Sequence, residues 1–375
     1  MTDFRIYLDY NATTPLDARV VEEMARAMEQ CGNPSSIHAE GRRARALVDD
    51  ARVQVGRLLH CDHRQVVFTS GGTEAINLAI LGAVRGAGAG RRHVVTSAME
   101  HSAVLNPCRR LEKEGFEVTR IRPTGDGMVE VGAVEEAIRP DTALISIQMA
   151  NNEIGTVQPV GEIVAMAHRR GVPVHTDAVQ ALGKIPVDVQ ELGVDLLSVS
   201  AHKIYGPKGA GALYCAPQLE LEPLLTGGSH ERGLRAGTEN VVGIHGFGVA
   251  ARLLVEEGLP ELLPLRRRLE EGLSMTSMTV ICRDAPRLPN TVNFYSQSWI
   301  GESMVVAFDL EGIAVSNGSA CSAGIIEPSH VILALGYNED VARSVIRVSV
   351  GKFTKEKEVE TLLSVVRKFD SGGGC

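Results

Sequence analysis

The sequence predicts an α/β protein whose larger domain is built on a mostly parallel β-sheet and whose smaller domain is also α/β. Between residues 65 and 214, short apolar and β-branched runs alternate with stretches of helical period or with turns. Near-continuous apolar strands between helices are typical of a sheet covered by helices on both faces. The seven runs are QVVFTS, RHVVTSA, FEVTRIR, TALISIQM, VPVHTDA, DLLSVSA and GALYC.

The flanking segments predict the remaining elements. Residues 40–59 have the spacing of an amphipathic helix, whose apolar face contains Ala44, Leu47, Val48, Ala51, Val55, Leu58 and Leu59. After Gly258 the pattern changes, because two prolines and a charged helix (LPELLPLRRRLEEGL) precede the strand-like runs NTVNFYS and SVIRVSV. We therefore expect a large domain over residues 12–258 and a small domain formed by residues 1–11 and 259–375.

Composition and charge restrict the class of function. The chain has 375 residues, 44% of them hydrophobic, and a formal net charge of −8. It contains no basic block interleaved with aromatic residues, so we expect no direct nucleic-acid binding. The first ten residues contain no apolar signal segment, and no run of about 18 apolar residues follows, so we expect a cytoplasmic protein without a membrane span.

The cysteines argue against a structural framework of disulfides or metal. The seven cysteines, at positions 31, 61, 108, 215, 282, 321 and 375, form no CxxC pair, so we expect neither a disulfide scaffold nor a bound metal. Most of them have the surroundings of small buried hydrophobes. Cys321, in VSNGSACSAG, and Cys375, in the SGGGC tail, have small or polar neighbours instead. For Cys375 the sequence leaves two readings, a second reactive thiol or an uncommitted end of the chain.

The stretch VVFTSGGTEAINLAI combines a strand, a Gly-Gly turn and a helix that begins near Thr73. Free N–H groups at such a helix start favour a phosphate, and Gly72 lets the anion approach the backbone. The stretch matches neither GxGxxG nor GxxxxGK[ST], so the dinucleotide and P-loop interpretations lack their fingerprint. Taken alone, it fits an ordinary turn with a Thr cap about equally well.

Two neighbouring strands end in polar residues. VPVHTDAVQ ends in Asp177 with Gln180 three residues later, and DLLSVSAHKIYGPKG ends in Ser200, His202 and Lys203. Ligands of open α/β sheets bind outside the carboxyl ends of the strands, so these side chains are expected to face one cavity. A phosphate cradle, an Asp for a pyridine nitrogen and a Lys for a Schiff base are the three parts that pyridoxal 5′-phosphate requires.

Three more polar positions accompany these strands. His101 follows a strand in TSAMEHSAVL, where it suits stacking and proton transfer, although a lone His is more often a hydrogen-bonding residue. Asn151 and Asn152 end another strand, and Asn suits the cofactor's ring hydroxyl as well as a turn. Arg347 lies inside the apolar strand SVIRVSV, where a buried guanidinium needs a carboxylate such as that of an amino acid.

The chain resembles the NifS/IscS-type cysteine desulfurases from about Ile6 to about Glu360. Ten motifs occur in that family's order: YLDYNATTP, GNPSSIH, FTSGGTEAINLAI, MEHSAVL, NNEIGTVQP, HTDAVQALGK, SAHKIYGPKGAGALY, GGSHERGLRAGT, GSACSAG and EPSHVILALG. The resemblance implies the type I, aminotransferase-like pyridoxal-phosphate fold. It also implies a homodimer with its active sites near the subunit interface.

The resemblance also implies a role for each matching residue. Lys203 would be the Schiff-base lysine, His101 the stacking acid/base and Cys321 the sulfur acceptor. Arg347, with Asn152, would bind the substrate carboxylate. The remaining cofactor contacts would be Asp177 at the pyridine nitrogen, Asn152 and Gln180 on the ring-hydroxyl side, Gly72, Thr73, Ser200 and His202 at the phosphate, and Thr238 at the phosphate of the other subunit.

The implied reaction converts L-cysteine to L-alanine and leaves the sulfur as a persulfide on Cys321, for delivery to an acceptor protein in iron–sulfur cluster assembly or other sulfur trafficking. The small residues around Cys321 suit a loop that moves, because few buried contacts must break. Two alternatives stay open. An ordinary aminotransferase or selenocysteine lyase shares Lys203 and Asp177 without needing a mobile cysteine, and a non-catalytic relative would keep the fold for binding alone.

Overall fold

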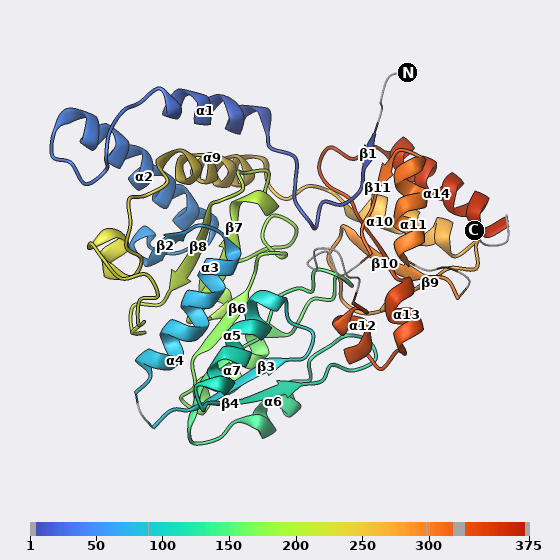
Figure 1. The fold of residues 1–375 in the computed structure, drawn as a ribbon, viewed down its shortest axis with the longest axis horizontal. Helices are drawn as coiled ribbons and strands as arrows, with labels where there is room; N and C mark the ends of the chain where they lie inside the picture. Colours follow the sequence, from blue (N-terminus) through green and yellow to red (C-terminus); the bar gives the residue numbers. More distant parts are fainter. Residues whose placement is uncertain (1–4, 89, 298, 300, 318–326, 372–375) are drawn as a thin grey trace.

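The large sheet of the protein is seven-stranded and mostly parallel (Figure 1). The computed structural model describes residues 5–88, 90–297, 299, 301–317 and 327–371. The strand order is β2-β8-β7-β6-β5-β3-β4, and β8 alone runs antiparallel to its neighbours, β2 and β7. Each predicted run forms one strand: β2 (Val66–Thr69), β3 (His93–Ser97), β4 (Glu117–Ile121), β5 (Thr142–Ser146), β6 (Val174–Asp177), β7 (Leu196–Ser200) and β8 (Gly211–Cys215). The prediction of a mostly parallel sheet is confirmed.

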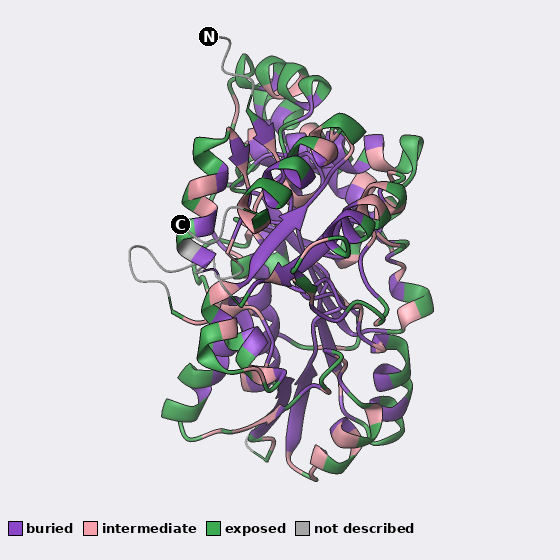
Figure 2. Ribbon diagram, turned by 90° about the vertical axis from the view of Figure 1, so that its right-hand side faces the viewer, coloured by how far each residue is buried: buried purple, intermediate pink, exposed green. Residues whose placement is uncertain are grey.

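Helices cover both faces of this sheet, as the alternation of strand side chains requires. One face packs in a core cluster with Val66, Val95 and Ile145, and the other in a cluster with Val67, Val94 and Leu144. Residues of α2 (Ala39–Leu58), α7 (Val160–Arg169) and α9 (Val241–Glu257) belong to the first cluster, and residues of α3 (Gly72–Asn77), α4 (Ala83–Gly86) and α5 (Ser102–Lys113) to the second. Figure 2 shows the buried strands between helices with exposed outer surfaces. The further helices of this region are α1 (Ala18–Met28), α6 (Val131–Ala137) and α8 (Val189–Leu192).

The predicted amphipathic helix is α2. Five residues of its predicted apolar face are buried, and Leu47 and Leu58 are half-buried. α2 packs closely on α9 because α9 presents a glycine there: a Cβ on Gly248 would lie 2.4 Å from the Cα of Ala51. The spacing of apolar residues therefore predicted both the helix and the face that it buries.

The C-terminal part of the chain builds a second, smaller layer of sheet and helices, which the first residues join. β1 (Ile6–Tyr7) pairs with β11 (Ile313–Ala314), and β10 (Thr291–Tyr295) pairs with both β9 (Thr279–Val280) and β12 (Ile346–Ser349). The helices here are α10 (Leu263–Leu273), α11 (Gly301–Leu310), α12 (His330–Ala334), α13 (Glu339–Ser344) and α14 (Glu356–Ser371). This region has its own core cluster, which includes Leu8, Phe294, Phe308, Val348 and Leu362.

The two regions also share side chains. Ile281, Leu288, Val331 and Val345 belong to the core cluster of the large sheet, although they lie in the C-terminal part of the chain. The predicted domain boundary between residues 258 and 259 therefore stays a prediction.

The cysteines and the surface bear on the expectations from composition. Cys108 and Cys282 are buried and Cys61 and Cys215 half-buried, but Cys31 is exposed, so the expectation of a buried thiol was wrong there. Cys321 and Cys375 lie outside the described residues.

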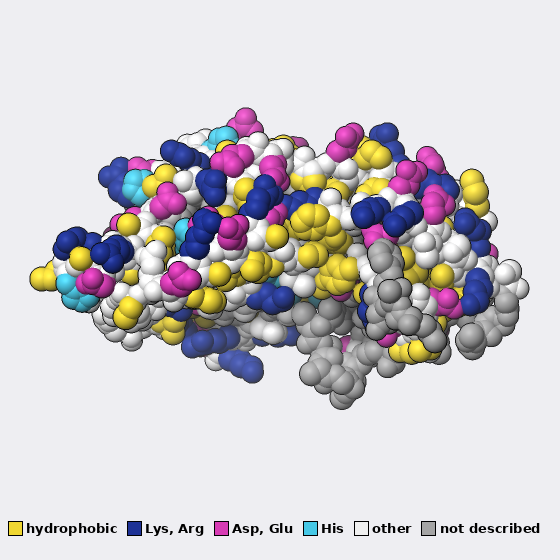
Figure 3. Space-filling view, turned by 90° about the horizontal axis from the view of Figure 1, so that it is seen from above, with side chains coloured by type: hydrophobic (Ala, Val, Ile, Leu, Met, Phe, Trp, Pro, Cys, Tyr) yellow, Lys and Arg dark blue, Asp and Glu magenta, His cyan; other side chains and the backbone are white. Residues whose placement is uncertain are grey.

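In the part of the chain that the structure describes, no helix has the length and apolarity to cross a bilayer. Figure 3 shows acidic and basic side chains interspersed over the upper face.

Candidate active site

A cavity of about 670 Å³ lies where the sequence predicts it, at the carboxyl ends of the large sheet's strands. Ten of the twelve predicted site residues line it: Gly72, Thr73, His101, Asn152, Asp177, Gln180, Ser200, His202, Lys203 and Arg347. Thr238 is exposed and does not line this cavity. Cys321 lies outside the described residues.

Asp177 is the last residue of β6, and its carboxylate is enclosed by protein. Its Oδ1 accepts a hydrogen bond of 2.9 Å from the backbone N–H of Val179. Burial raises its pKa to about 6, although the charge of Lys203 opposes the shift. A buried carboxylate of this kind is stabilised in its charged form by a protonated ring nitrogen placed against it.

Lys203 ends the 3₁₀ turn Ala201–Lys203 that directly follows β7. Its Nζ donates to the backbone carbonyl oxygens of Asn11 and, at 2.9 Å, of Ala12. The amine therefore lies on the N-terminal segment of the chain while its side chain lines the cavity. These two acceptors are main-chain carbonyl groups, which carry no net charge.

The predicted phosphate cradle is close-packed around a glycine. A Cβ on Gly72 would lie 2.8 Å from Cγ2 of Val179 and 3.5 Å from Cβ of Ser200, so a larger residue would separate the start of α3 from the ends of β6 and β7. His202 contributes from the same side, where its Nδ1 lies 3.1 Å from Oγ1 of Thr13. Burial lowers the pKa of His202 to about 4.

His101 is fixed by the helix that it precedes. It is the N-cap residue of α5, and its Nδ1 accepts a hydrogen bond of 3.1 Å from the N–H of Ala103. Because Nδ1 is the acceptor, the neutral ring carries its proton on Nε2. Burial, followed by the charge of Lys203, lowers the pKa of His101 to about 4, so the imidazole is uncharged at neutral pH.

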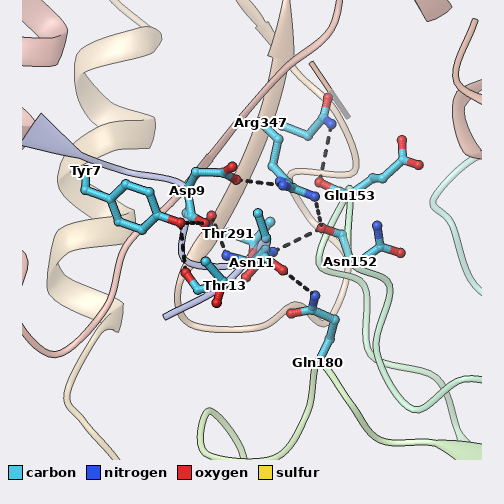
Figure 4. Close-up of polar contacts among 12 residues, drawn as sticks. Tyr7, Asp9, Asn11, Thr13, Asn152, Glu153, Gln180, Thr291 and Arg347 are labelled. Atoms are coloured by element: carbon cyan, nitrogen blue, oxygen red, sulfur yellow. Dashed lines mark hydrogen bonds and ion pairs between the residues drawn. The ribbon is translucent and has the colours of Figure 1, made fainter. Parts of the chain in front are cut away.

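Arg347 enters the cavity from β12, and the chain itself supplies a carboxylate for it. The guanidinium donates to Oδ1 of Asp9 at 2.7 Å and to the carbonyl oxygen of Asn152 at 3.1 Å (Figure 4). Its Nε is buried and has no partner among the described residues. The sequence predicted that this buried arginine needs a carboxylate, but it did not identify Asp9.

Asn11 connects three segments around the cavity through its hydrogen bonds. Its Nδ2 donates to the carbonyl oxygen of Asn152 at 3.0 Å and to Oγ1 of Thr291 at 2.9 Å, and its own carbonyl oxygen accepts from Nε2 of Gln180 at 2.8 Å (Figure 4). Sequence reasoning gave Asp9 and Asn11 no role. The available signal was the motif YLDYNATTP, which contains both.

Glu100 is a second buried carboxylate that sequence reasoning missed. It accepts from the hydroxyl of Ser97 at 2.6 Å and from the N–H of Gln148 at 3.0 Å, so it connects the segments that follow β3 and β5. Its carbonyl oxygen lies 2.9 Å from Nε2 of His330. Burial raises the pKa of Glu100 to about 8, because the enclosed carboxylate has no cationic partner among these contacts.

The arrangement fits pyridoxal 5′-phosphate on observations of the chain alone. The buried carboxylate of Asp177 can pair with a cationic ring nitrogen, and the amine of Lys203 lines the same cavity. At the predicted phosphate site, a Cβ on Gly72 would collide with Val179. Among the described residues, no group of three or more His, Cys, Asp or Glu side chains could hold a metal ion. The cavity presents an amine, a carboxylate, an imidazole and a guanidinium.

Comparison with known proteins gives one consistent result. The chain matches the family model described as "Aminotransferase class-V" over residues 6–362. It is 46% identical to cysteine desulfurase IscS of Salmonella arizonae, over 97% of this chain and 92% of that protein. Among solved structures it is similar to a NifS-like protein, with 35% identity, a TM-score of 0.92 and coverage of 98% and 100% of the two chains. It is also similar to SspA in complex with cysteine, with 38% identity, a TM-score of 0.83 and coverage of 93% and 100%.

Proposed function

This chain belongs to the class-V aminotransferase family, and on that premise we propose which of its residues carry out the reaction. The protein is a pyridoxal-phosphate-dependent cysteine desulfurase of the NifS/IscS type, which converts L-cysteine to L-alanine with transfer of the sulfur to an enzyme cysteine. The proposal concerns the residues of the site, the subunit arrangement and the acceptor.

The observation that carries the assignment of the site is the meeting of Asp177 and Lys203 in one cavity. Pyridoxal 5′-phosphate, when bound, supplies an electron sink for carbanion chemistry at the substrate. Lys203 would hold its aldehyde carbon, Asp177 its ring nitrogen and His101 one face of its ring. Asn152 and Gln180 would lie on the ring-hydroxyl side, and the phosphate would rest on Gly72, Thr73, Ser200 and His202.

Arg347 binds the substrate carboxylate in this proposal. The guanidinium is already fixed by the carbonyl oxygen of Asn152, so its orientation does not depend on the substrate. Its ion pair with Asp9 neutralises it until L-cysteine arrives, and the two carboxylates then share or exchange the guanidinium. Lys203 and His101 take and return protons at the substrate, with His101 starting as the uncharged base.

Cys321 receives the sulfur in this proposal. Its thiolate attacks the substrate sulfur, the carbon–sulfur bond breaks and a sulfur–sulfur bond forms, so L-cysteine and the Cys321 thiol become L-alanine and the persulfide. The described residues on each side of the segment support this role. Ser316 pairs with the backbone of Arg347, and Glu327 lines the cavity, so both ends of the segment lie at the site.

The quaternary structure and the acceptor are also proposals. We propose a homodimer in which Thr238, exposed and away from its own cavity, reaches the phosphate of the other subunit. A sulfur-acceptor protein, in iron–sulfur cluster assembly or other sulfur trafficking, takes the persulfide sulfur. A cytoplasmic location and the absence of direct nucleic-acid binding stay predictions from the sequence.

Replacement of Cys321 by Ser tests this function against its alternatives. We expect the variant to retain the cofactor's visible absorption band and to lose alanine formation from L-cysteine, while Cys31→Ser, a change at an exposed cysteine, retains both. An ordinary aminotransferase would stay active without Cys321. A protein that shows no visible band after addition of the cofactor would be a non-catalytic relative.

A further inference from the structure

A second lysine, Lys184, lies buried directly behind the cavity. It is 6% exposed and ends the turn that follows β6, and it does not line the cavity. Its Nζ donates to two oxygens of one residue, the carbonyl oxygen of Gln180 at 3.0 Å and its Oε1 at 2.6 Å. A buried lysine is costly unless its amine is used or paired, and among the described residues the hydrogen bonds of this amine go to Gln180.

The contact determines which way the Gln180 amide points. Nζ of Lys184 donates to Oε1, and the carbonyl oxygen of Asn11 can only accept, so the two contacts together place Oε1 toward Lys184 and Nε2 toward Asn11. Nε2 then faces the carbonyl oxygen of Asn11, to which it donates at 2.8 Å. A reversed amide would place a donor against Lys184 and an oxygen against Asn11, so both hydrogen bonds would be lost.

This orientation leaves Gln180 a donor toward the cavity. Nε2 carries two N–H bonds and uses one on Asn11, and within the described residues the second has no acceptor although Gln180 lines the cavity. A donor at this place favours a ligand oxygen that carries negative charge. If Oε1 of Gln180 faced the cavity instead, it would favour the protonated form of the ligand oxygen.

The charges around Lys184 agree with such a role. Burial, and then the positive charges of Lys203 and Arg347, hold its pKa well below the usual lysine value. A lysine amine carries at least two N–H bonds in either protonation state, so it can make both hydrogen bonds to Gln180.

We propose that Lys184 is a positioning residue, which holds the Gln180 amide so that an N–H faces the ring oxygen of the cofactor. The inference rests on the proposed cofactor site and adds to it a residue that never touches the ligand. Its consequence is electronic, because the N–H stabilises the anionic ring oxygen and lowers the pH at which the bound cofactor's visible band titrates.

The test uses Lys184→Met, Gln180→Leu and the double variant, with Lys113→Met as an exposed control. For each, one measures the cofactor dissociation constant, the pH midpoint of the visible band and the melting temperature of the cofactor-free protein. We expect Lys184→Met to raise the dissociation constant about tenfold, the value of one hydrogen bond to a charged group, and to raise the midpoint in the same direction as Gln180→Leu. In the Gln180→Leu background, Lys184→Met should change the cofactor dissociation constant less than about twofold and leave the pH midpoint nearly where Gln180→Leu alone puts it.

Two results would overturn the inference. One is a Lys184→Met variant that lowers only the melting temperature, which a purely structural lysine would do. The other is full additivity of the two substitutions, which would show that Lys184 does not act through Gln180. A wild-type protein without a visible band would instead contradict the proposed cofactor site.

A structure of the cofactor-loaded wild-type protein tests the same contact without any substitution, should Lys184→Met fail to fold. We expect Nε2 of Gln180 within hydrogen-bonding distance of the ring oxygen and Nζ of Lys184 still on Oε1. A direct contact between Lys184 and the cofactor, or Oε1 turned toward the ring, would contradict the inference.

Discussion

The two walls of the cavity hold their charged groups in different ways. On the wall formed by the ends of β6 and β7, Asp177 and Lys203 are held by backbone groups, the N–H of Val179 and the carbonyl oxygens of Asn11 and Ala12. On the opposite wall, Arg347 of β12 is held partly by a charged side chain, that of Asp9. Uncharged backbone partners do not replace a charged ligand group. Asp9, in contrast, is a carboxylate and competes with the substrate carboxylate for the guanidinium of Arg347. In the proposed function, this difference corresponds to a preformed cofactor wall and to a substrate wall on which Arg347 must exchange a partner.

The largest effect is expected on the cofactor wall, from Lys203→Ala. We expect loss of the cofactor's characteristic visible band and a fall in turnover of at least about 10³-fold, because the covalent attachment point is removed. The control is Lys208→Ala, an exposed lysine five residues later, which should leave both unchanged. An unchanged band in Lys203→Ala would mean that another amine holds the cofactor.

On the substrate wall, Arg347→Met should separate substrate binding from cofactor binding. The variant loses the charge-assisted hydrogen bonds from the guanidinium to the substrate carboxylate, so we expect KM for L-cysteine to rise about 100-fold. The cofactor dissociation constant should change less than about threefold. Steady-state kinetics and a cofactor titration measure the two quantities. An equal loss of both would show that the two walls do not differ in the way described.

Asp9→Asn should have the opposite, smaller effect on the same wall. Removing the competing carboxylate is expected to lower KM for L-cysteine about threefold. It also leaves the buried guanidinium without its counter-charge, so the free energy of unfolding of the cofactor-free protein should fall by about 2 kcal/mol. Denaturant titration with and without the substitution measures the second effect. A raised KM would mean that Asp9 orients Arg347 rather than competing for it.

The smallest effect on turnover is expected from Glu100→Gln, which acts on stability instead. The pKa of Glu100 is raised to about 8 in the folded protein, so the folded state keeps a proton that the unfolded chain loses, and this contribution to stability is lost as pH rises from about 4.5 to about 8. Relative to wild type, Glu100→Gln should therefore gain stability across that range. Denaturant titrations at several pH values check it, and parallel curves would contradict the raised pKa.

The local sequence was sufficient to predict the large sheet and the two strand ends that meet at the cavity. All seven predicted runs became strands, because each combines β-branched residues with flanking turns, and the rule for strand ends brought Asp177 and Lys203 into one cavity. The two-residue strands β1, β9 and β11 carry too few residues for a periodic signal. They were not predicted.

The substrate wall was less accessible to sequence reasoning, because it depends on distant pairs. Asp9 and Arg347 are 338 positions apart, so no local pattern connects them. Lys184 was missed for another reason. It lies in a turn where lysine is usually exposed, and only the folded structure shows that it is buried.

The most direct measurement is peptide mass mapping of the cofactor-loaded protein after incubation with L-cysteine and alkylation of thiols. The account predicts one additional sulfur on the peptide that contains Cys321, formed together with L-alanine and absent from Lys203→Ala. The exposed Cys31 serves as the internal control, and its peptide should carry no additional sulfur. L-Alanine formed without sulfur on Cys321 would contradict the account, because the sulfur would then leave the cavity without passing to the enzyme.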